Sequence, residues 1–388
     1  MGIIEKNDEF IANTYQRFKI NLVRGEGSHV FDENGKEYID MGTGIGVNAF
    51  GFCDDKWKKA VTSQLDLLQH GSNLHYSEPS TLLAELLCKK TGMKKVFFSN
   101  SGAEANECAI KVARKYATQK YGDFSHNTII TLKNSFHGRT IATLSATGQD
   151  VFHKDFGPFV DKFVYATVND IEDLKSKANE NDCAAIMFET VQGEGGVCPL
   201  TKEFIEAIKE VAKEKELLII VDEVQTGNGR TGKLYSYMHY DLYPDIVSTA
   251  KGLGGGLPIG ATLLGDRVKD VLTFGSHGTT FGGNPVCCAG ALSIIERIDD
   301  KLLKEVEDKA EYIRNELKDC KHIKSITGLG LMIGIETDKD AKEIIRECIE
   351  NGVIVLSAKA KVRLLPPLNI SSEDLKKAIG ILKSIIEK

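Results

Sequence analysis

The stretch Ser248-Thr-Ala-Lys-Gly-Leu-Gly-Gly-Gly-Leu-Pro258 is the point from which the rest of the chain can be interpreted. It continues a short apolar run, Ile246-Val247, and sets a single lysine, Lys251, directly before several glycines. A lysine between a strand and flexible backbone can hold its amine against a bound molecule, and an amine shielded from water suits Schiff-base chemistry. Because most lysines near glycines are only surface residues in turns, this reading needs a second signal.

A second apolar run supplies that signal. Residues 217–221 are apolar and end in Asp222-Glu-Val-Gln225, so an acid and a lysine follow two strand-like runs at corresponding positions. An unpaired carboxylate beside a buried strand is costly. Asp222 therefore requires a cationic partner, and a protonated ring nitrogen of a cofactor would serve.

The composition indicates a globular protein with room for one large domain and one smaller one. The chain has 388 residues, of which 42% are hydrophobic and 27% charged. The net charge of −6 argues against nucleic acid or an anionic membrane as the main partner. We find neither an apolar run near the roughly 20 residues of a membrane span nor a secretion signal. Nine scattered cysteines without a CxxC pair predict a reducing cytoplasm and no metal site.

Residues 49–285 are predicted to form a large α/β domain with a mostly parallel sheet flanked by helices. Short apolar runs alternate there with amphipathic helices, which is typical of that fold class. A helix after the first strand is indicated by an apolar stripe that includes Ala105, Ala109 and Val112. The expected strands are 95–99, 128–133, 162–166, 184–188, 217–221, 245–250 and 259–264.

The two ends of the chain are predicted to form a smaller α+β domain. Residues 1–48 are an N-terminal segment expected to pack with it, and they contain a hairpin signal, Asn34-Gly35. Residues 286–388 are the C-terminal small domain. It should contain a long helix through 303–317, strands at 329–336 and 353–356, and a closing helix behind a Ser371 cap.

Polar or glycine-rich clusters directly follow five of the expected strands. In an open α/β sheet, ligands bind beyond the carboxyl ends of the strands, so five clusters at one edge predict a pocket. The clusters are Ser99–Ala103, Phe136–Arg139, Glu189–Gly196, Asp222–Gln225 and Lys251.

Some of these side chains suggest particular ligands. Ser101-Gly102-Ala103 lies between a strand and a helix and could hold a phosphate, although Ser-Gly is also a common turn. Phe136 could stack on a planar ring or belong to the core. Arg139 could bind a carboxylate or be an ordinary exposed arginine, and Arg363 is a second candidate for binding a carboxylate. The loop 277–285 offers a second site for a phosphate.

Taken together, these motifs resemble those of the class III (subgroup II) pyridoxal-phosphate-dependent aminotransferases of fold type I, most closely the acetylornithine aminotransferases. The resemblance runs from Gly42 to Pro367. It implies that Lys251 binds pyridoxal 5′-phosphate covalently and, once released, carries the reaction's proton, and that Asp222 keeps the ring nitrogen protonated. It also implies that Gln225 binds the phenolic oxygen and Phe136 stacks on the ring. The phosphate would be held by Ser101, Gly102, Ala103 and the partner subunit's Thr280, which implies a homodimer.

The resemblance further implies two substrates in one site. Arg139 would bind the carboxylate far from the reacting amine in both substrates, and Arg363 would bind the α-carboxylate of glutamate and 2-oxoglutarate. Glu194 would pair with Arg363 when the amine donor is bound and move away for glutamate; a static salt bridge is the alternative. The implied reaction transfers the terminal amine of N-acetylornithine to 2-oxoglutarate, a step of arginine biosynthesis.

Two positions bear on which substrate is used. Ornithine aminotransferases of the family carry a tyrosine in the loop that matches 43–48, whereas Ile45 stands here, which favours an N-acyl donor and also tolerates 4-aminobutyrate. Thr190 stands where the family usually has proline, which leaves the rigidity of that loop open.

Several other functions remain open from the sequence. Within the family the alternatives are succinylornithine, 4-aminobutyrate and ornithine aminotransferases. A pyridoxal-phosphate aminomutase of the same fold is disfavoured by Gln192-Gly193-Glu194. A non-catalytic protein would have no need of both Lys251 and Asp222.

Overall fold

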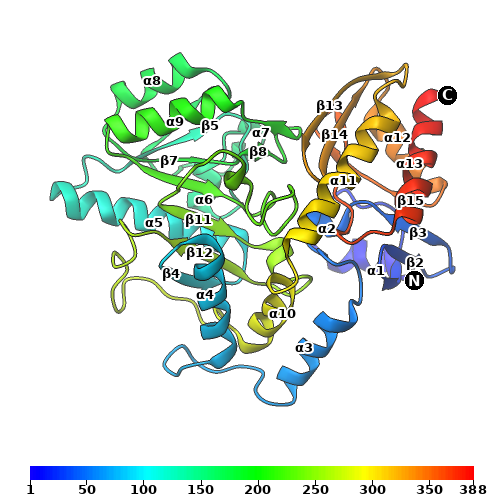
Figure 1. Ribbon diagram of the computed structural model, residues 1–388, viewed down its shortest axis with the longest axis horizontal. Coiled ribbons are helices and arrows are strands. Elements are labelled where there is room, and N and C mark those ends of the chain that lie inside the picture. The colour runs from blue at the N-terminus through cyan, green and yellow to red at the C-terminus, as the bar shows by residue number, and fades with distance from the viewer.

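A seven-stranded sheet forms the larger lobe of the computed structural model, which describes all 388 residues (Figure 1). Neighbouring strands run parallel except for β12, which is antiparallel to the strands on both sides. The carboxyl ends of the other six strands therefore lie at one edge. The strands, in spatial order, are β4 (Lys95–Ser99), β12 (Gly260–Leu264), β11 (Ile246–Thr249), β10 (Leu218–Asp222), β7 (Cys183–Phe188), β5 (Thr128–Leu132) and β6 (Phe163–Ala166).

Successive side chains of the central strands pack against different helices, because side chains alternate between the faces of a sheet. On β7 and β10, Met187 and Ile220 pack in one cluster with α5 (Gly102–Tyr121). Their neighbours Phe188 and Val221 pack in another with α8 (Ile171–Glu180) and α9 (Lys202–Glu214). Both faces are covered, which explains why these strands read as continuous apolar runs.

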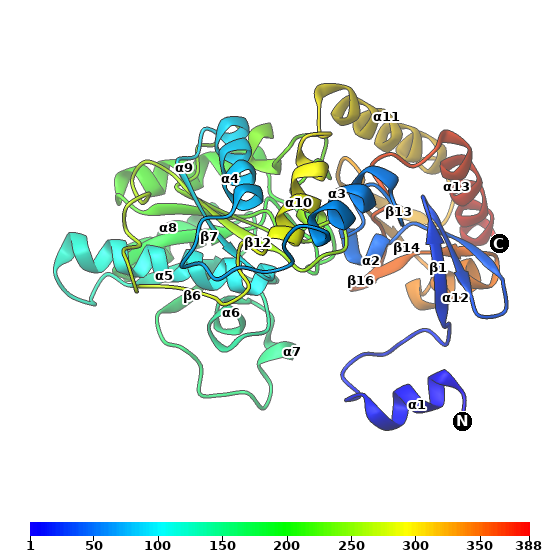
Figure 2. The same cartoon turned by 90° about the horizontal axis from the view of Figure 1, so that it is seen from below.

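The remaining helices of this lobe surround the sheet or lead away from it. The short helices α6 (Ile141–Ala146) and α7 (Asp150–His153) lie in the segment between β5 and β6. The helices α3 (Asp55–Leu65), α4 (Glu78–Thr91) and α10 (Pro285–Ile295) pack together, and α10 leads toward the smaller lobe (Figure 2).

The smaller lobe combines both ends of the chain. One antiparallel sheet has the order β13 (Ile323–Leu329), β14 (Met332–Thr337), β17 (Lys361–Leu364) and β16 (Leu356–Ala358). A second has the order β1 (Leu22–Glu26), β2 (His29–Asp32), β3 (Glu37–Asp40) and β15 (Val353–Ile354), so a C-terminal strand completes an N-terminal sheet. The helices are α11 (Asp300–Leu317), α12 (Ala341–Glu350) and α13 (Ser372–Glu387), while α1 (Ile3–Phe10) stands apart with no buried residue (Figure 2).

The α/β class and the seven strands of the large sheet are confirmed, with strand ends shifted by at most two residues. The hairpin at Asn34-Gly35 joins β2 to β3 as expected, and Ser371 caps α13 by accepting from the Asp374 N–H at 3.0 Å. No helix combines the length and the apolar character that crossing a membrane requires.

Two strand predictions in the small lobe were wrong in detail. The expected strand at 329–336 is two strands, β13 and β14, joined by a turn in which Gly330 has a φ of 51°. That left-handed conformation suits glycine and reverses the chain. The expected strand at 353–356 is also divided, because β15 pairs with β3 while β16 pairs with β17.

Candidate functional site

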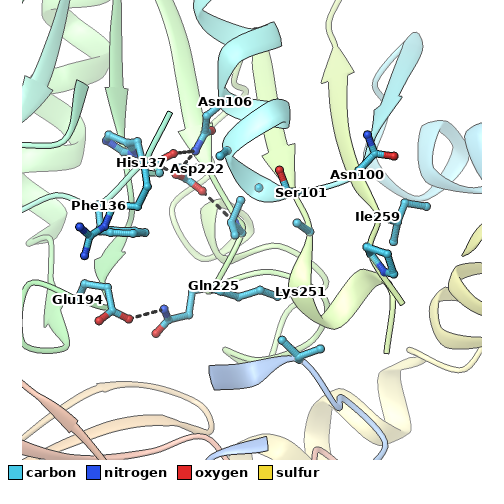
Figure 3. A pocket seen from close by; sticks show the side chains of 18 of the residues that line it. Asn100, Ser101, Asn106, Phe136, His137, Glu194, Asp222, Gln225, Lys251 and Ile259 are labelled. Atoms are coloured by element: carbon cyan, nitrogen blue, oxygen red, sulfur yellow. Dashed lines mark hydrogen bonds and ion pairs between the residues drawn. The ribbon is translucent and has the colours of Figure 1, made fainter. Parts of the chain in front are cut away.

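A cavity of about 490 Å³ lies at the carboxyl edge of the large sheet, where it meets the N-terminal segment (Figure 3). All five polar clusters that follow the sheet strands contribute to its wall, as the strand-end rule predicts. Val47 adds a contact from the turn after β3. The predicted residues on the wall are Ser101, Gly102, Ala103, Phe136, Arg139, Glu194, Asp222, Gln225 and Lys251.

Asp222 is the last residue of β10 and is only 3% exposed. Its Oδ2 accepts from the Asn106 amide at 2.7 Å and from the His137 ring at 2.8 Å, and its Oδ1 accepts from the Val224 N–H at 3.0 Å (Figure 3). These donors orient the carboxylate. Oδ1 retains a free acceptor position, so it can receive a proton-bearing nitrogen from a molecule in the cavity.

Lys251 follows β11, beside Asp222 across the sheet, and its side chain makes no hydrogen bond or ion pair. Loss of surrounding water lowers its pKa, while the charge of Glu194 acts in the opposite direction. An amine that loses its proton more readily is a better nucleophile and a better base. The backbone of Lys251 has a φ of 48°, a strained conformation for a residue other than glycine.

The start of α5 provides a site for an anion. Ser101 caps this helix by accepting from the Glu104 N–H at 3.1 Å. The N–H groups of Gly102 and Ala103 have no acceptor in the protein and lie on the cavity wall. A Cβ on Gly102 would lie 2.7 Å from the side chain of Val224, so only glycine fits. Free N–H groups at the positive end of a long helix favour a phosphate.

The loop 189–196, called the gate loop below, follows β7 and contributes Glu189 and Glu194 to the cavity wall. Its Glu194 accepts from the Arg363 Nη1 at 2.5 Å and from the Gln225 amide at 3.2 Å. Burial alone would raise the pKa of Glu194, but the Arg363 guanidinium reverses this and the net shift is downward. The side chain of Glu194 is 28% exposed and that of Arg363 only 3%, so the carboxylate has space to move while the guanidinium does not.

Arg363, on β17, is aimed at the gate loop rather than free at the surface. Its Nη1 also donates to the Gln225 Oε1 at 3.1 Å, and its buried Nε has no partner. A guanidinium with unused donors can receive a second carboxylate in bidentate fashion. If Glu194 moved away, Arg363 would need such a ligand, because an unpaired buried charge costs several kcal/mol.

Arg139 lies on the cavity wall and is exposed, with no acidic partner. Its guanidinium lies 3.7 Å from the ring centroid of Phe152 and 5.6 Å from that of Phe136. The aromatic rings hold the side chain in place without neutralising its charge. Arg139 is therefore available for a carboxylate.

Three predicted residues are not on the cavity wall: Arg363, which is hydrogen-bonded to the wall residues Glu194 and Gln225, and Ile45 and Thr280. Ile45 is 41% exposed and lies in a left-handed turn, 43–46, with a φ of 65°. The turn is anchored because the Thr43 hydroxyl donates to the Leu365 carbonyl at 2.7 Å, two residues after Arg363. Thr280 is exposed on the loop before α10. In a single chain neither Ile45 nor Thr280 reaches the cavity.

Three further residues belong to the site although their individual roles were not predicted. Asn106 and His137 hold Asp222, as described above. The buried carboxyl of Glu189 accepts from the N–H groups of Phe136, at 2.9 Å, and Gly193, at 3.2 Å. Burial raises the pKa of Glu189 to about 7. The position of Glu189 directly after a strand was the available signal for this residue.

The chemistry available in the cavity follows from these positions. The wall of one cavity carries an unpaired amine, a buried carboxylate with a free acceptor position, a phosphate-sized anion site and the Arg139 guanidinium. The Arg363 guanidinium is hydrogen-bonded to two residues of that wall, Glu194 and Gln225. This arrangement can hold a phosphorylated ring cofactor and a substrate that carries one or two carboxylates.

Comparison with known proteins gives one consistent family. The sequence model described as "Aminotransferase class-III" matches residues 10–386. The chain is 49% identical over 381 residues to an acetylornithine aminotransferase of Haemophilus ducreyi, covering 98% of this chain and 97% of that one.

Solved structures agree with this result. An ornithine aminotransferase from Toxoplasma gondii, described with partial occupancy of PLP at its active site, superimposes with a TM-score of 0.94 at 30% identity. That match covers 99% of this chain and 93% of the other. An N-acetylornithine aminotransferase from Stenotrophomonas maltophilia superimposes with a TM-score of 0.86 at 32% identity, covering 99% and 98% of the two chains.

Proposed function

Because the chain belongs to the class-III aminotransferases, which depend on pyridoxal 5′-phosphate, we propose that this aminotransferase moves the terminal amine of N-acetylornithine to 2-oxoglutarate. The products would be N-acetylglutamate 5-semialdehyde and glutamate, in arginine biosynthesis. The observation that carries the proposal is the Glu194–Arg363 pair at a cavity whose wall also carries the unpaired Arg139. This geometry suits a site that accepts one carboxylate in one half-reaction and two in the other.

The residues of the cavity fit pyridoxal 5′-phosphate. The unpaired N–H groups of Gly102 and Ala103, with Ser101, would hold its phosphate. The free acceptor position of Asp222 would hold its protonated ring nitrogen, and Phe136 would stack on the ring. When bound, this cofactor acts as an electron sink for the carbon that bears the amine.

The mechanism assigned to the chain's own residues is one of binding and proton transfer. Asp222, held in orientation by Asn106 and His137, would accept from the protonated ring nitrogen of the cofactor. Lys251 would hold the cofactor and, as a free amine, would move a proton at the substrate carbon. Gln225 would donate to the cofactor's phenolic oxygen, a role that requires its amide to turn from Glu194.

Arg139 and Arg363 would bind different carboxylates. Arg139 would bind the α-carboxylate of N-acetylornithine or the side-chain carboxylate of glutamate. Arg363 would bind the α-carboxylate of glutamate and 2-oxoglutarate once Glu194 withdraws. Ile45, on its anchored turn beside Val47, would lie near the acylated nitrogen, where an apolar side chain tolerates an acyl group and cannot satisfy a free ammonium.

Replacing Arg139 with alanine is expected to raise the KM for both substrates by roughly ten- to a hundredfold, because both lose a charged hydrogen-bonded contact. Steady-state kinetics with each substrate in turn measures this effect. If only the keto acid is affected, the role given to Arg139 is wrong.

Replacing Arg363 with alanine is expected to affect the glutamate half-reaction by at least about tenfold more than the N-acetylornithine half-reaction, because only glutamate loses a direct contact between its carboxylate and that guanidinium. Single-turnover rates for each donor give the ratio directly. Equal losses in the two half-reactions would contradict a movable Glu194.

The proposed donor is tested by mixing the purified holoenzyme separately with N-acetylornithine, ornithine and 4-aminobutyrate. The visible absorbance of the bound cofactor should be lost rapidly with N-acetylornithine and slowly with the other two. Equal or faster loss with 4-aminobutyrate would assign the enzyme to that donor. Release of free keto product with a separate acceptor excludes an aminomutase.

We also propose that the enzyme is a homodimer that places Thr280 of the partner subunit near the phosphate site. Exposed apolar residues gather on segments that contact one another: the Asn73 amide donates to the Thr279 and Gly282 carbonyls at 3.1 and 2.9 Å, and His70 packs on Phe281. An apolar patch of this kind indicates a protein interface. Its exposed members are Leu65, Leu67, Leu68, Leu74, Tyr76, Leu82, Phe274 and Phe281.

Sedimentation of the wild type and of Phe281→Asp tests this interface. The wild type should be dimeric at micromolar concentration and the variant monomeric with little activity. A monomeric and active wild type would contradict a shared site. The nine free cysteines fit a reducing compartment, and we propose a cytoplasmic location.

A further inference from the structure

The gate loop has a second attachment on the side away from the cavity. Glu189 lines the cavity, whereas the next residue, Thr190, is fully buried and does not. The Thr190 hydroxyl forms a hydrogen bond with the Ser236 hydroxyl, on the short helix η1 (Ser236–His239). The Thr190 carbonyl accepts from the Leu200 N–H at 2.9 Å.

The direction of these hydrogen bonds follows from counting protons. Each hydroxyl has one proton to donate. Ser236 donates its proton to the Glu223 Oε1 at 2.7 Å, so Thr190 must be the donor to Ser236. The chain of donors thus runs from Thr190 through Ser236 to a carboxylate.

Glu223 is a fully buried carboxyl that needs these donors. Its Oε1 also accepts from the Tyr237 N–H at 2.9 Å, and its Oε2 accepts from the Thr226 hydroxyl at 2.6 Å. Burial raises its pKa, and these hydrogen bonds oppose that rise. Because an unsatisfied buried carboxylate is costly, the network has one stable arrangement and fixes the parts that it joins.

The network ends on the segment that carries the cofactor site. Glu223 directly follows Asp222 and lies two residues before Gln225, which contacts both Glu194 and Arg363. The gate loop is therefore connected to the segment 222–225 at two places. Glu194 contacts Gln225 directly. Thr190, at the start of the loop, is connected to Glu223 through the Ser236 hydroxyl.

We propose that Thr190 is a positioning residue for Glu194. Its hydroxyl fixes the base of the gate loop through Ser236 and Glu223, so that the Glu194 side chain moves while the loop backbone stays in place. The hydrogen bond thereby supplies the restraint that the ring of a proline would give at this position. This inference rests on the proposed function, because it assigns Thr190 to the discrimination between one-carboxylate and two-carboxylate donors.

If Thr190 no longer fixes the start of the gate loop, the Glu194–Arg363 ion pair should become weaker. That pair is needed only when the one-carboxylate donor is bound. The kcat/KM for N-acetylornithine should therefore fall, while that for glutamate, which needs Glu194 to withdraw, should be little changed. Thr190→Val removes the hydroxyl and keeps the shape. We expect the ratio of kcat/KM for glutamate to that for N-acetylornithine to rise roughly fivefold, the value of one lost hydrogen bond.

Three further variants distinguish a role of Thr190 in positioning Glu194 from a general loss of protein stability. Thr190→Ser keeps the hydroxyl and should keep the wild-type ratio. Thr131→Val removes an equally buried hydroxyl that has no partner, on β5, and should also keep it. Ser236→Ala should raise the ratio as Thr190→Val does, and the double variant should rise no further, because both substitutions break one chain.

The proposal is overturned if the ratio in Thr190→Val stays within about twofold of wild type, or if Thr190→Ser or Thr131→Val shifts it equally. Additive effects of Thr190→Val and Ser236→Ala would also overturn it. If the wild type prefers 4-aminobutyrate to N-acetylornithine, the proposed donor fails. The same ratio is then measured with 4-aminobutyrate, another one-carboxylate donor, and still tests Thr190.

Discussion

Lys251→Ala is expected to lower turnover by roughly a thousandfold or more, with both substrates alike. The amine lines the cavity, has no partner in the protein and is the only amine on its wall, so no neighbouring amine can take over its proton transfer. Turnover and single-turnover absorbance measure the loss. The exposed Lys202 at the start of α9 is the matched control, and Lys202→Ala should behave as wild type.

The Lys251→Ala variant distinguishes a loss of the chemical step from a loss of folding. The Lys251→Ala variant should remain folded, because the ammonium contributes no hydrogen bond or ion pair to the structure. A folded variant that retains more than about a tenth of the wild-type turnover would contradict the assignment of Lys251 as the proton-carrying residue.

Asp222→Asn is expected to lower turnover by about a hundredfold or more, because a neutral amide cannot stabilise a protonated ring nitrogen in a site shielded from water. The substitution also brings an amide to face the Asn106 amide and the His137 ring, which both donate to the native carboxylate. We expect less cofactor to be retained after gel filtration, in addition to the loss of rate.

Asp245→Asn provides the comparison for Asp222→Asn. Asp245 precedes β11 at the opposite end of the sheet, where its carboxylate accepts from the Ile219 N–H at 2.9 Å and pairs with Arg267. That variant should unfold at a lower temperature and keep its turnover per folded molecule. Similar losses of turnover in the two variants would mean that Asp222 acts only in folding.

The large sheet and the strand-end residues of the site could be predicted from the sequence because they depend on local pattern. Buried parallel strands read as apolar runs, and the residue after each run lies at the ligand-binding edge. Lys251 and Asp222 were found in this way. The same rule located the gate loop and the start of α5, but it gave only the region and not the contacts.

The contacts depend on strand register and on loops that no local pattern specifies. His137 follows β5 and Asp222 ends β10. The two side chains meet only because β5 and β10 lie two places apart in the sheet, with β7 between them. The pairing of Glu194 with Arg363 joins the two lobes, and it was expected from the family resemblance alone. Ile45 adopts a conformation that is rare for a β-branched side chain, so its exposure could not be anticipated.

The left-handed backbone of Lys251 has a consequence for the stability of the fold. A residue other than glycine at a φ of 48° costs about 1 kcal/mol or more of folding free energy, which glycine at the same position would not incur. A Lys251→Gly chain should therefore unfold at a higher temperature than the wild type while being inactive. The amine and the easier backbone cannot both be present at position 251, so the chemistry proposed for Lys251 is obtained at a cost in folding free energy.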